Sequence, residues 1–252
     1  MSDTILVVPD NHVLTLTLNR PDKKNALTHA MYDRLASEIA AAQTNDAIRC
    51  VVITGTGDMF TSGNDLMDFR NSPPLGQDTP VSRFLSAIST AEKPLIAAVN
   101  GLAVGVGLTM LLHCDLVIAS ETAGFKAPFV DLALVPEAAS SLLLPQRVGH
   151  AWANDIFLTG RTVTAEEALR LGIVSRIVTQ DALAGETASL AAALSAKAPA
   201  AVKATKSLMK SANDQVPARM AEESALFVRQ LQSAEFMEAV SAFMEKRPPK
   251  FG

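Results

Sequence analysis

The sequence predicts an α/β protein with a mostly parallel sheet, followed by a helical part from about residue 190. Short apolar runs recur up to residue 178, and segments of helical periodicity separate them, which is the pattern of βαβ units. Between residues 181 and 246 the pattern is helical throughout. With 252 residues, 48% of them hydrophobic, the chain can bury a substantial core as one large domain or one domain with a small appendage.

In the N-terminal part, alternation and capping signals define the elements. Residues 13–19 alternate apolar and polar side chains, so they predict a strand. Thr28 can cap a helix that runs to about Gln43 with apolar side chains along one face. Residues 50–54 are a short, fully apolar strand, and the Gly-rich polar stretch 55–65 is a loop.

The middle of the chain continues this order. A short helix is expected to begin at Asp65. Residues 70–80 carry Pro and Gly and predict a mobile loop. The elements expected after this loop are a helix at 81–92, a strand at 94–100, a helix at 108–113, a strand at 115–120, helices from 139 and a last strand at 172–178.

Composition and charge exclude several classes of function. The formal net charge of −4 gives no basic field, so nucleic acid is not expected as a partner. The apolar segments are too short to span a bilayer and no secretory signal is visible, so a cytoplasmic protein without a membrane role is expected. Cys50 and Cys114 lie in or beside apolar runs, with no second cysteine at metal or redox spacing, which predicts buried reduced thiols.

Two strand–loop–helix junctions are candidate ligand sites. Residues 50–66 and 95–110 each leave the carboxyl end of a predicted parallel strand, where ligands gather in such sheets. Their loops offer backbone N–H groups near 62–65 and 105–108, which suit an anion. A nucleotide phosphate is one interpretation, but the G-x-G-x-x-G pattern fails at Met110 and no P-loop is present. A purely structural turn and a small oxyanion are the others.

Acidic and histidine side chains give fewer signals, and no metal site is predicted. His113 is interpreted as a structural residue where a helix meets a strand, and Asp131 as a polar residue of a loop or strand end. Glu137, which follows Pro136, has two interpretations. It is a helix-start acid that favours the helix dipole, or a lone general base whose basicity burial raises for abstracting a proton next to a carbonyl.

Five segments carry a family resemblance over essentially the whole chain. One contains the motif NGLAVGVG, followed by CD and a strand. The segments are residues 18–27, 51–66, 93–120, 158–178 and 243–251. Together they are similar to the crotonase superfamily, the enoyl-CoA hydratase/isomerase family. The resemblance implies a crotonase-like ββα spiral core over residues 1–190, with an acyl-CoA site. It also implies a helical trimerisation region over residues 191–252, in homotrimers or hexamers that are dimers of trimers.

The resemblance also implies site residues. The backbone N–H groups of Asn64 and Val106 are similar in position to the pair that polarises the thioester carbonyl in this family. Coenzyme A contacts are implied for Lys23, Lys24, Ser62, Asp65 and Met67, and for Phe243 and Lys246 of a neighbouring subunit's C-terminal helix. The implied substrate is an acyl-CoA thioester. No metal or separate cofactor is implied, because coenzyme A is part of the substrate.

Departures from the family pattern narrow the implied reaction. Where a typical hydratase carries two glutamates that activate water, this chain has Thr109 and Phe129. Glu137 remains, at a position similar to that of the single catalytic glutamate of Δ3,Δ2-enoyl-CoA isomerases. The resemblance therefore implies an isomerase that moves the double bond of a 3-enoyl-CoA to give the trans-2-enoyl-CoA. A hydratase, another crotonase-family reaction and a CoA-thioester-binding protein without turnover are the alternatives.

Overall fold

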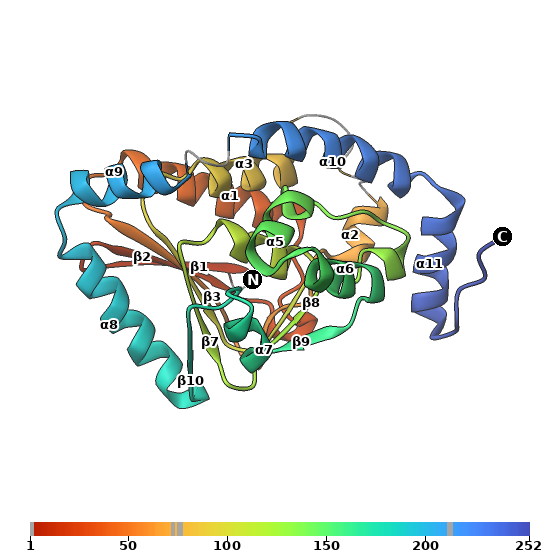
Figure 1. Ribbon diagram of the computed structural model, residues 1–252, viewed down its shortest axis with the longest axis horizontal. Coiled ribbons are helices and arrows are strands. Elements are labelled where there is room, and N and C mark those ends of the chain that lie inside the picture. The colour runs from red at the N-terminus through yellow and green to blue at the C-terminus, as the bar shows by residue number, and fades with distance from the viewer. Residues whose placement is uncertain (1–2, 72–73, 75–77, 211–213) are drawn as a thin grey trace.

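The computed structural model describes residues 3–71, 74, 78–210 and 214–252, and a six-stranded sheet lies at its centre (Figure 1). The sheet has the order β1-β2-β3-β5-β7-β10. The β1–β2 pair is antiparallel and the other pairs are parallel, which confirms the predicted mostly parallel sheet. Its strands are Ile5–Asp10 (β1), Val13–Leu18 (β2), Cys50–Gly55 (β3), Leu95–Val99 (β5), Leu116–Ser120 (β7) and Arg176–Val178 (β10).

A second sheet of shorter strands has the order β4-β6-β8-β9. Its strands are Met59–Thr61 (β4), Leu102–Val104 (β6), Gly124–Lys126 (β8) and Thr162–Thr164 (β9). β4, β6 and β8 directly follow β3, β5 and β7, so the chain passes from the first sheet to the second on successive turns. This confirms the α/β fold with a crotonase-like ββα spiral.

Helices cover both faces of the six-stranded sheet (Figure 1). α1 (His29–Thr44) and α3 (Pro80–Thr90) pack together over one face, and α8 (Leu183–Ser195) packs against the other. Alternation along β3 explains this, because Val51 and Ile53 join the larger apolar cluster while Cys50 and Val52 join the cluster that contains the buried side chains of α8. The predicted cap is present, since Thr28 Oγ1 accepts from Met31 N at 3.4 Å.

The remaining helices are short or lie in the second half of the chain. They are η1 (Pro21–Lys23), α2 (Leu66–Asn71), α4 (Val106–Thr109), η2 (Met110–His113), η3 (Val130–Leu132), α5 (Ser140–Val148), α6 (His150–Thr159), α7 (Ala165–Arg170), η4 (Gln180–Ala182), α9 (Pro199–Lys210), α10 (Val216–Leu231) and α11 (Ala234–Glu245), where η marks a 3₁₀ turn. α10 packs on α5, and α11 packs on α10 and η3 at one end of the molecule (Figure 1).

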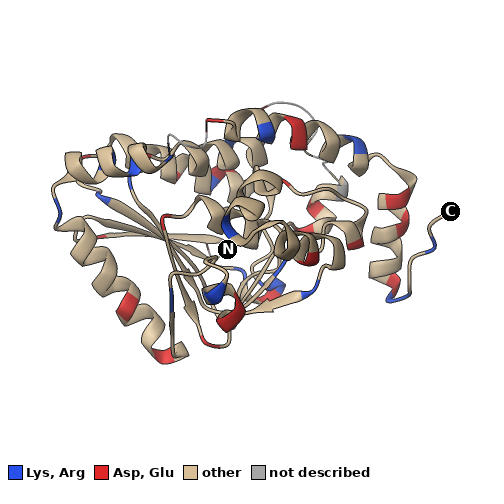
Figure 2. Cartoon of the chain, viewed as in Figure 1, with Lys and Arg blue, Asp and Glu red and all other residues tan. Residues whose placement is uncertain are grey.

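The C-terminal tail folds back on α11. In Figure 2, acidic residues lie along α11 and basic residues lie on the tail that follows it. Arg247 forms ion pairs of 2.6 Å with both Glu238 and Glu245, and Lys250 N donates to Glu238 Oε1 at 2.7 Å. These contacts fix the direction of the tail, so the last residues stay beside the helix.

Some elements differ from the sequence prediction. The sequence does not predict β1 or the strands of the second sheet. β1 is six residues long, but its residues ILVVPD do not alternate apolar and polar side chains. The strands of the second sheet have three residues each, which is too short to show alternation. The strand expected at 172–178 spans only Arg176–Val178, since its first residues form the turn after α7. The helix expected at 108–113 begins earlier, at Val106. Of the loop expected at 70–80, residues 72–73 and 75–77 lie outside the described residues.

Along the described residues, no helix is long and apolar enough to cross a membrane. Cys50 and Cys114 are buried free thiols, as the sequence predicts. No group of three or more histidine, cysteine, aspartate or glutamate residues that could hold a metal ion occurs within the described part of the chain.

Candidate active site

The amide loop, residues 62–65, follows β4 and lies beside the segment that leads into α1. Ser62 N donates to Lys24 O at 2.9 Å. Leu27 N donates to Gly63 O at 2.8 Å, and Asp65 N donates to Leu27 O at 2.9 Å. None of these bonds uses the N–H group of Asn64, so the loop is held in place while that amide stays available.

The end of β6 lies directly against the amide loop. β4 and β6 pair in parallel, so their carboxyl ends lie at the same edge of the second sheet. A Cβ on Gly63, which has φ of +89°, would lie 3.0 Å from Val104 O. A Cβ on Gly107 would lie 2.5 Å from the Thr61 methyl group. Only glycine allows this close approach, which brings the start of α4 beside the amide loop.

Two backbone donors are therefore presented at this edge. Gly105 precedes α4 with φ of +57° and ψ of −116°, a conformation that glycine readily adopts, and Val106 is the first helical residue. First-turn N–H groups have no acceptor within their own helix. Within the described part of the chain, neither Val106 N–H nor Asn64 N–H donates to another protein group. The arrangement suits a substrate oxygen that gains negative charge.

Glu137 lies in the acid turn, residues 136–140, and its side chain is 7% exposed. Thr109 Oγ1 donates to Glu137 Oε1 at 2.7 Å. Because Thr109 lies one turn after Val106 on α4, the carboxylate is tied to the helix that presents one of the two amides. Burial raises the pKa of Glu137 to about 7; the Thr109 hydrogen bond lowers the pKa and the charge of Glu223 raises it. Such a carboxyl group suits accepting and returning a proton near neutral pH.

Tyr32 contacts the amide loop and lies near enough to Glu137 to be affected by its charge. The Tyr32 hydroxyl, on α1, donates to Asn64 Oδ1. Burial raises the pKa of Tyr32 well above its usual value, and the charge of Glu137 raises it further, so the phenol and the carboxylate are within electrostatic range. Asn64, Val106 and Glu137, which the sequence singled out separately, thus surround one region of the fold.

The backbone of the acid turn is unusual. Ala138 and Ala139 have φ of +62° and +55°, in the left-handed region that residues with a Cβ rarely adopt. Ala138 O accepts from His113 Nε2 at 2.7 Å, and burial lowers the pKa of His113 to about 4, so the ring is neutral at pH 7. The carboxylate of Glu223, on α10, accepts from Ala139 N at 2.6 Å and Ser141 N at 2.9 Å.

The two positions that depart from the hydratase pattern are both buried. The Thr109 hydroxyl donates to Glu137, and Phe129 packs against Phe157 with tilted rings whose centroids lie 6.2 Å apart. Neither side chain can take up a proton. Asp131 is half-exposed and lies 3.8 Å from Lys126, which agrees with its interpretation as a loop residue.

Most of the expected coenzyme A contacts gather around the amide loop. Lys23 and Lys24 are exposed at η1, and the main chain of Lys24 binds Ser62. Met67, at the start of α2, is 41% exposed. The structure thus brings these residues to one edge of the site, where their part in binding stays a prediction.

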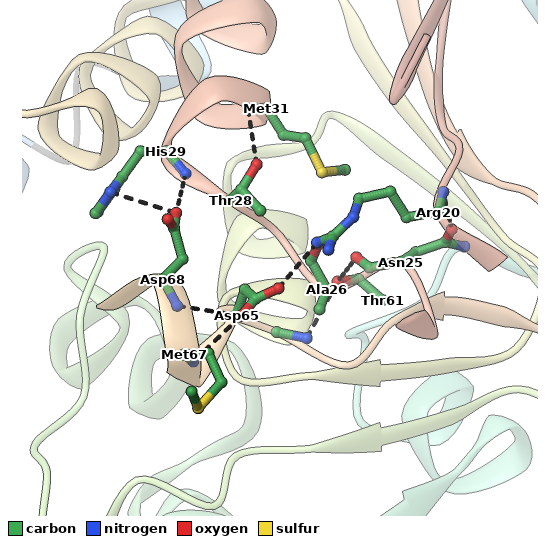
Figure 3. Close-up of polar contacts among 11 residues, drawn as sticks. Arg20, Asn25, Ala26, Thr28, His29, Met31, Thr61, Asp65, Met67 and Asp68 are labelled. Carbon is green, nitrogen blue, oxygen red and sulfur yellow. Dashed lines mark hydrogen bonds and ion pairs between the residues drawn. The ribbon is translucent and has the colours of Figure 1, made fainter. Parts of the chain in front are cut away.

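Asp65 has structural partners in this cluster (Figure 3). Its Oδ1 accepts from the N–H groups of Met67 and Asp68 at 3.2 Å, which caps α2, and its Oδ2 binds Arg20 Nη1 at 3.0 Å. Burial raises the pKa of Asp65, but these bonds outweigh it, so the pKa lies below its ordinary value. Arg20 also donates to Ala26 O at 2.6 Å and so holds the segment before α1.

Phe243 and Lys246 lie on α11, away from this cluster along the sequence. Phe243 is 63% exposed, and Met237 and Met244 on the same helix are 54% and 52% exposed. Lys246 ends the helix with φ of +54°. Their expected position over the nucleotide of a neighbouring subunit stays a prediction.

Sequence reasoning missed Tyr32 and Glu223. Each lies within a helical segment, where a tyrosine is typical of the core and a glutamate of the surface. The apolar face of α1 gave a signal that Tyr32 is buried. No local signal distinguishes Glu223 from its exposed neighbour Glu222, because burial of Glu223 depends on contact with α5.

Comparisons with known proteins agree with this geometry. Residues 9–252 match the enoyl-CoA hydratase/isomerase protein family. The chain is 34% identical to a 2,3-dehydroadipyl-CoA hydratase of Escherichia coli K12 over 98% of both chains. It is 32% identical to the peroxisomal enoyl-CoA delta isomerase 3 of Mus musculus over 98% of this chain and 80% of that one. A crystal structure of an enoyl-CoA hydratase/isomerase from Pseudoalteromonas atlantica T6c is 50% identical with a TM-score of 0.95, covering 99% of this chain and 100% of that chain.

The chain belongs to the enoyl-CoA hydratase/isomerase family, which is the crotonase superfamily. It is therefore an enzyme of a family that acts on acyl-CoA thioesters. Relatives whose names specify a hydratase and an isomerase are almost equally identical to it, so the type of reaction has to be argued from the site.

Proposed function

We propose that the protein is a Δ3,Δ2-enoyl-CoA isomerase with Glu137 as its single acid–base. The Glu137 carboxylate removes a proton from C2 of a 3-enoyl-CoA thioester, and the electron pair of that C–H bond moves into a dienolate. Protonated Glu137 then returns the proton to C4. The double bond moves from C3–C4 to C2–C3, so substrate and product are isomers and no proton is gained or lost.

One observation carries this proposal. Glu137 is a buried carboxyl group with a pKa of about 7, tied by Thr109 to the helix that presents the Val106 amide. A single group that has to be a base and then an acid works best when its pKa lies near the working pH. Thr109 and Phe129, where the family pattern has acids in hydratases, leave Glu137 to carry both proton transfers.

The amides of Asn64 and Val106 are proposed to hold the thioester oxygen. Charge builds up on that oxygen when the dienolate forms, and fixed N–H groups stabilise it without reorganising. Glu137 is buried, so water is largely kept from its carboxylate. Exclusion of water supports formation of the dienolate, because water does not compete for the proton. Because both proton transfers use Glu137, the reaction needs no metal or redox cofactor.

Coenzyme A is proposed to lie along the edge formed by Lys23, Lys24, Ser62 and Met67. Basic side chains and open main-chain groups suit its phosphates and amides. α11 of a neighbouring copy, through Phe243 and Lys246, is proposed to close over the nucleotide in a homotrimer or a hexamer.

The direct test compares the wild type with Glu137→Gln on a 3-enoyl-CoA, followed by the appearance of the conjugated 2-enoyl thioester. Glutamine keeps the size of the side chain and its bond to Thr109 but cannot take up the proton. We expect kcat to fall about 1,000-fold, within the range for loss of a general acid–base. A wild type that leaves 3-enoyl-CoA unchanged would overturn the proposal.

Hydration of a 2-enoyl-CoA is the second candidate, favoured by the 34% identity to a 2,3-dehydroadipyl-CoA hydratase. The same two proteins distinguish it when incubated with crotonyl-CoA in water. Formation of 3-hydroxyacyl-CoA that survives Glu137→Gln would show a water-activating group other than Glu137. Loss of both isomerisation and hydration in Glu137→Gln would show that both reactions depend on the Glu137 carboxylate.

A further inference from the structure

Glu223 is a buried acid that the proposed proton transfer does not use. Its side chain is 4% exposed and projects from α10 toward the start of α5. Both carboxylate oxygens are occupied, one by Ala139 N at 2.6 Å and the other by Ser141 N at 2.9 Å. Burial raises the pKa of Glu223, while the hydrogen bonds from Ser141 and Ala139 and the charge of Arg219 lower it.

The contact meets the chain directly after Glu137. Ala138 and Ala139 are both left-handed, a conformation that is unfavourable for residues with a Cβ. Such a turn persists only where its surroundings hold it in place. Glu223 holds the turn on its C-terminal side, and His113 holds Ala138 O on the other. The direction of the Glu137 side chain depends on this backbone.

Several elements place titratable or polar groups around Glu137, and most of these groups are neutral. Tyr32 of α1 is neutral because burial raises its pKa, and His113 of η2 is neutral because burial lowers its pKa. Thr109 of α4 gives a hydrogen bond and carries no charge. Glu223 of α10 raises the pKa of Glu137 by its negative charge. Arg219, one turn before Glu223, offsets part of that charge.

We propose that Glu223 is a positioning residue for Glu137: through the amides of Ala139 and Ser141 it holds the acid turn, and its own carboxylate places a second negative charge near the first. This inference rests on the proposed role of Glu137 as the acid–base. It assigns to α10 a positioning role in a site formed by residues far earlier in the chain.

Glu223→Gln tests the proposal, with Glu222→Gln as the matched control. Glutamine has one acceptor oxygen for two N–H donors, so one bond to the acid turn is lost together with the charge. We expect kcat to fall roughly 10- to 100-fold, because a misplacement of about 1 Å can cost on the order of 100-fold, while KM changes little. The control residue is on the same helix, is 62% exposed and undergoes the same change of charge. It loses an exposed 3.3 Å ion pair with Arg219, which contributes little, so it should retain wild-type kinetics.

The pH dependence separates positioning from a merely structural role. Loss of the Glu223 charge lowers the pKa of Glu137, so the acid limb of the kcat/KM profile moves from about pH 7 to lower pH in Glu223→Gln and stays in place in the control. Glu223→Asp keeps the charge with a shorter side chain. It should lower kcat while leaving the midpoint near that of the wild type. Glu223→Gln with wild-type kcat and an unmoved midpoint would overturn the proposal, as would a lower melting temperature with no effect on the midpoint.

A readout that does not need turnover keeps the two proposals apart. Glutamate labelled with carbon-13 at Cδ reports the titration of Glu137, assigned by the signal that disappears in Glu137→Gln. A lower pKa in Glu223→Gln supports the coupling even if the wild type does not isomerise 3-enoyl-CoA. An unchanged pKa of Glu137 in Glu223→Gln rejects the coupling even if the wild type isomerises 3-enoyl-CoA.

Discussion

The amide loop and the acid turn contribute to the same region, yet they are held in opposite ways. The amide loop presents neutral N–H groups, and main-chain bonds to residues 24–27 hold it beside glycines that allow close approach. The acid turn presents a carboxylate away from water, on two left-handed alanines held by His113 and Glu223. A donor needs only a backbone conformation that exposes it, whereas a buried carboxylate opposes its own ionisation and needs extra support. The acid turn is therefore the region where the proposed chemistry lowers the stability of the fold.

After the loss of Glu137 itself, the largest effect is expected at the amide side, from Gly105→Ala. No atom lies within 4 Å of the added Cβ, so the change acts through the backbone alone, at φ of +57° and ψ of −116°. An alanine there should rotate the peptide that carries the Val106 N–H group and lower kcat about 100- to 1,000-fold, as for loss of one oxyanion donor. Steady-state kinetics on 3-enoyl-CoA measure it.

Gly185→Ala is the control for this change, because the added Cβ again meets no atom within 4 Å but the backbone is helical. It should leave kcat unchanged and stabilise α8 slightly. Equal loss of activity in both variants would contradict the assignment of Gly105 to the amide site.

The next effect concerns stability and belongs to the acid turn. Folding raises the pKa of Glu137 from 4.5 to about 7, so the native state keeps its proton to higher pH than the unfolded chain. The free energy of unfolding therefore falls as pH rises from about 4.5 to about 7 and stays lower above it. Glu137→Gln should be more stable than the wild type by up to about 3 kcal/mol at pH 8 and equally stable at pH 4, at about 1.4 kcal/mol for each pKa unit.

Urea denaturation of both proteins at the two pH values measures this difference. Loss of activity together with a gain of stability identifies a residue kept for chemistry. A Glu137→Gln variant that is less stable at pH 8 would mean that the carboxylate is a structural acid.

A smaller effect is expected for Thr109→Val, which removes the hydrogen bond that lowers the pKa of Glu137. The pKa should rise further above about 7, so activity at pH 7 falls about three- to tenfold and recovers at higher pH, since one pKa unit is a factor of ten in ionisation. The pH dependence of kcat/KM measures it. Thr109→Ser keeps the hydroxyl and should retain the wild-type profile; an identical shift in both variants would rule out the hydrogen bond as the cause.

The smallest effect is expected for Asp65→Asn in the amide loop. Asparagine can still cap α2 through Oδ1 but loses the ion pair with Arg20, in which both side chains are 19% exposed. The free energy of unfolding should fall by about 1 kcal/mol, as for a partly exposed pair. Denaturant unfolding at pH 7 measures it. The acid limb of the pH–activity profile should not move. A shift would show electrostatic coupling between the amide loop and the acid turn.

How far the sequence predicts this protein depends on the range of the interactions involved. The fully apolar run at 50–54 appears as β3, because a strand buried on both faces shows its burial in its own residues. The three-residue strands of the second sheet leave no such pattern, and Ile173 and Val174 resemble a strand although they pack as a buried turn. For the site, glycine spacing pointed to the amides, and the resemblance pointed to Glu137.

The sequence by itself determined the α/β class, the helical C-terminal part and the residues that the family resemblance marks as its site. Only the tertiary structure decided that Glu137 is buried with a pKa near 7, since a turn carboxylate and a buried base have the same local sequence. The tertiary structure also placed Glu223, 84 residues beyond Ala139, against the acid turn. A glutamate in a helix is usually solvated, and packing of α10 on α5 alone turns this one inward.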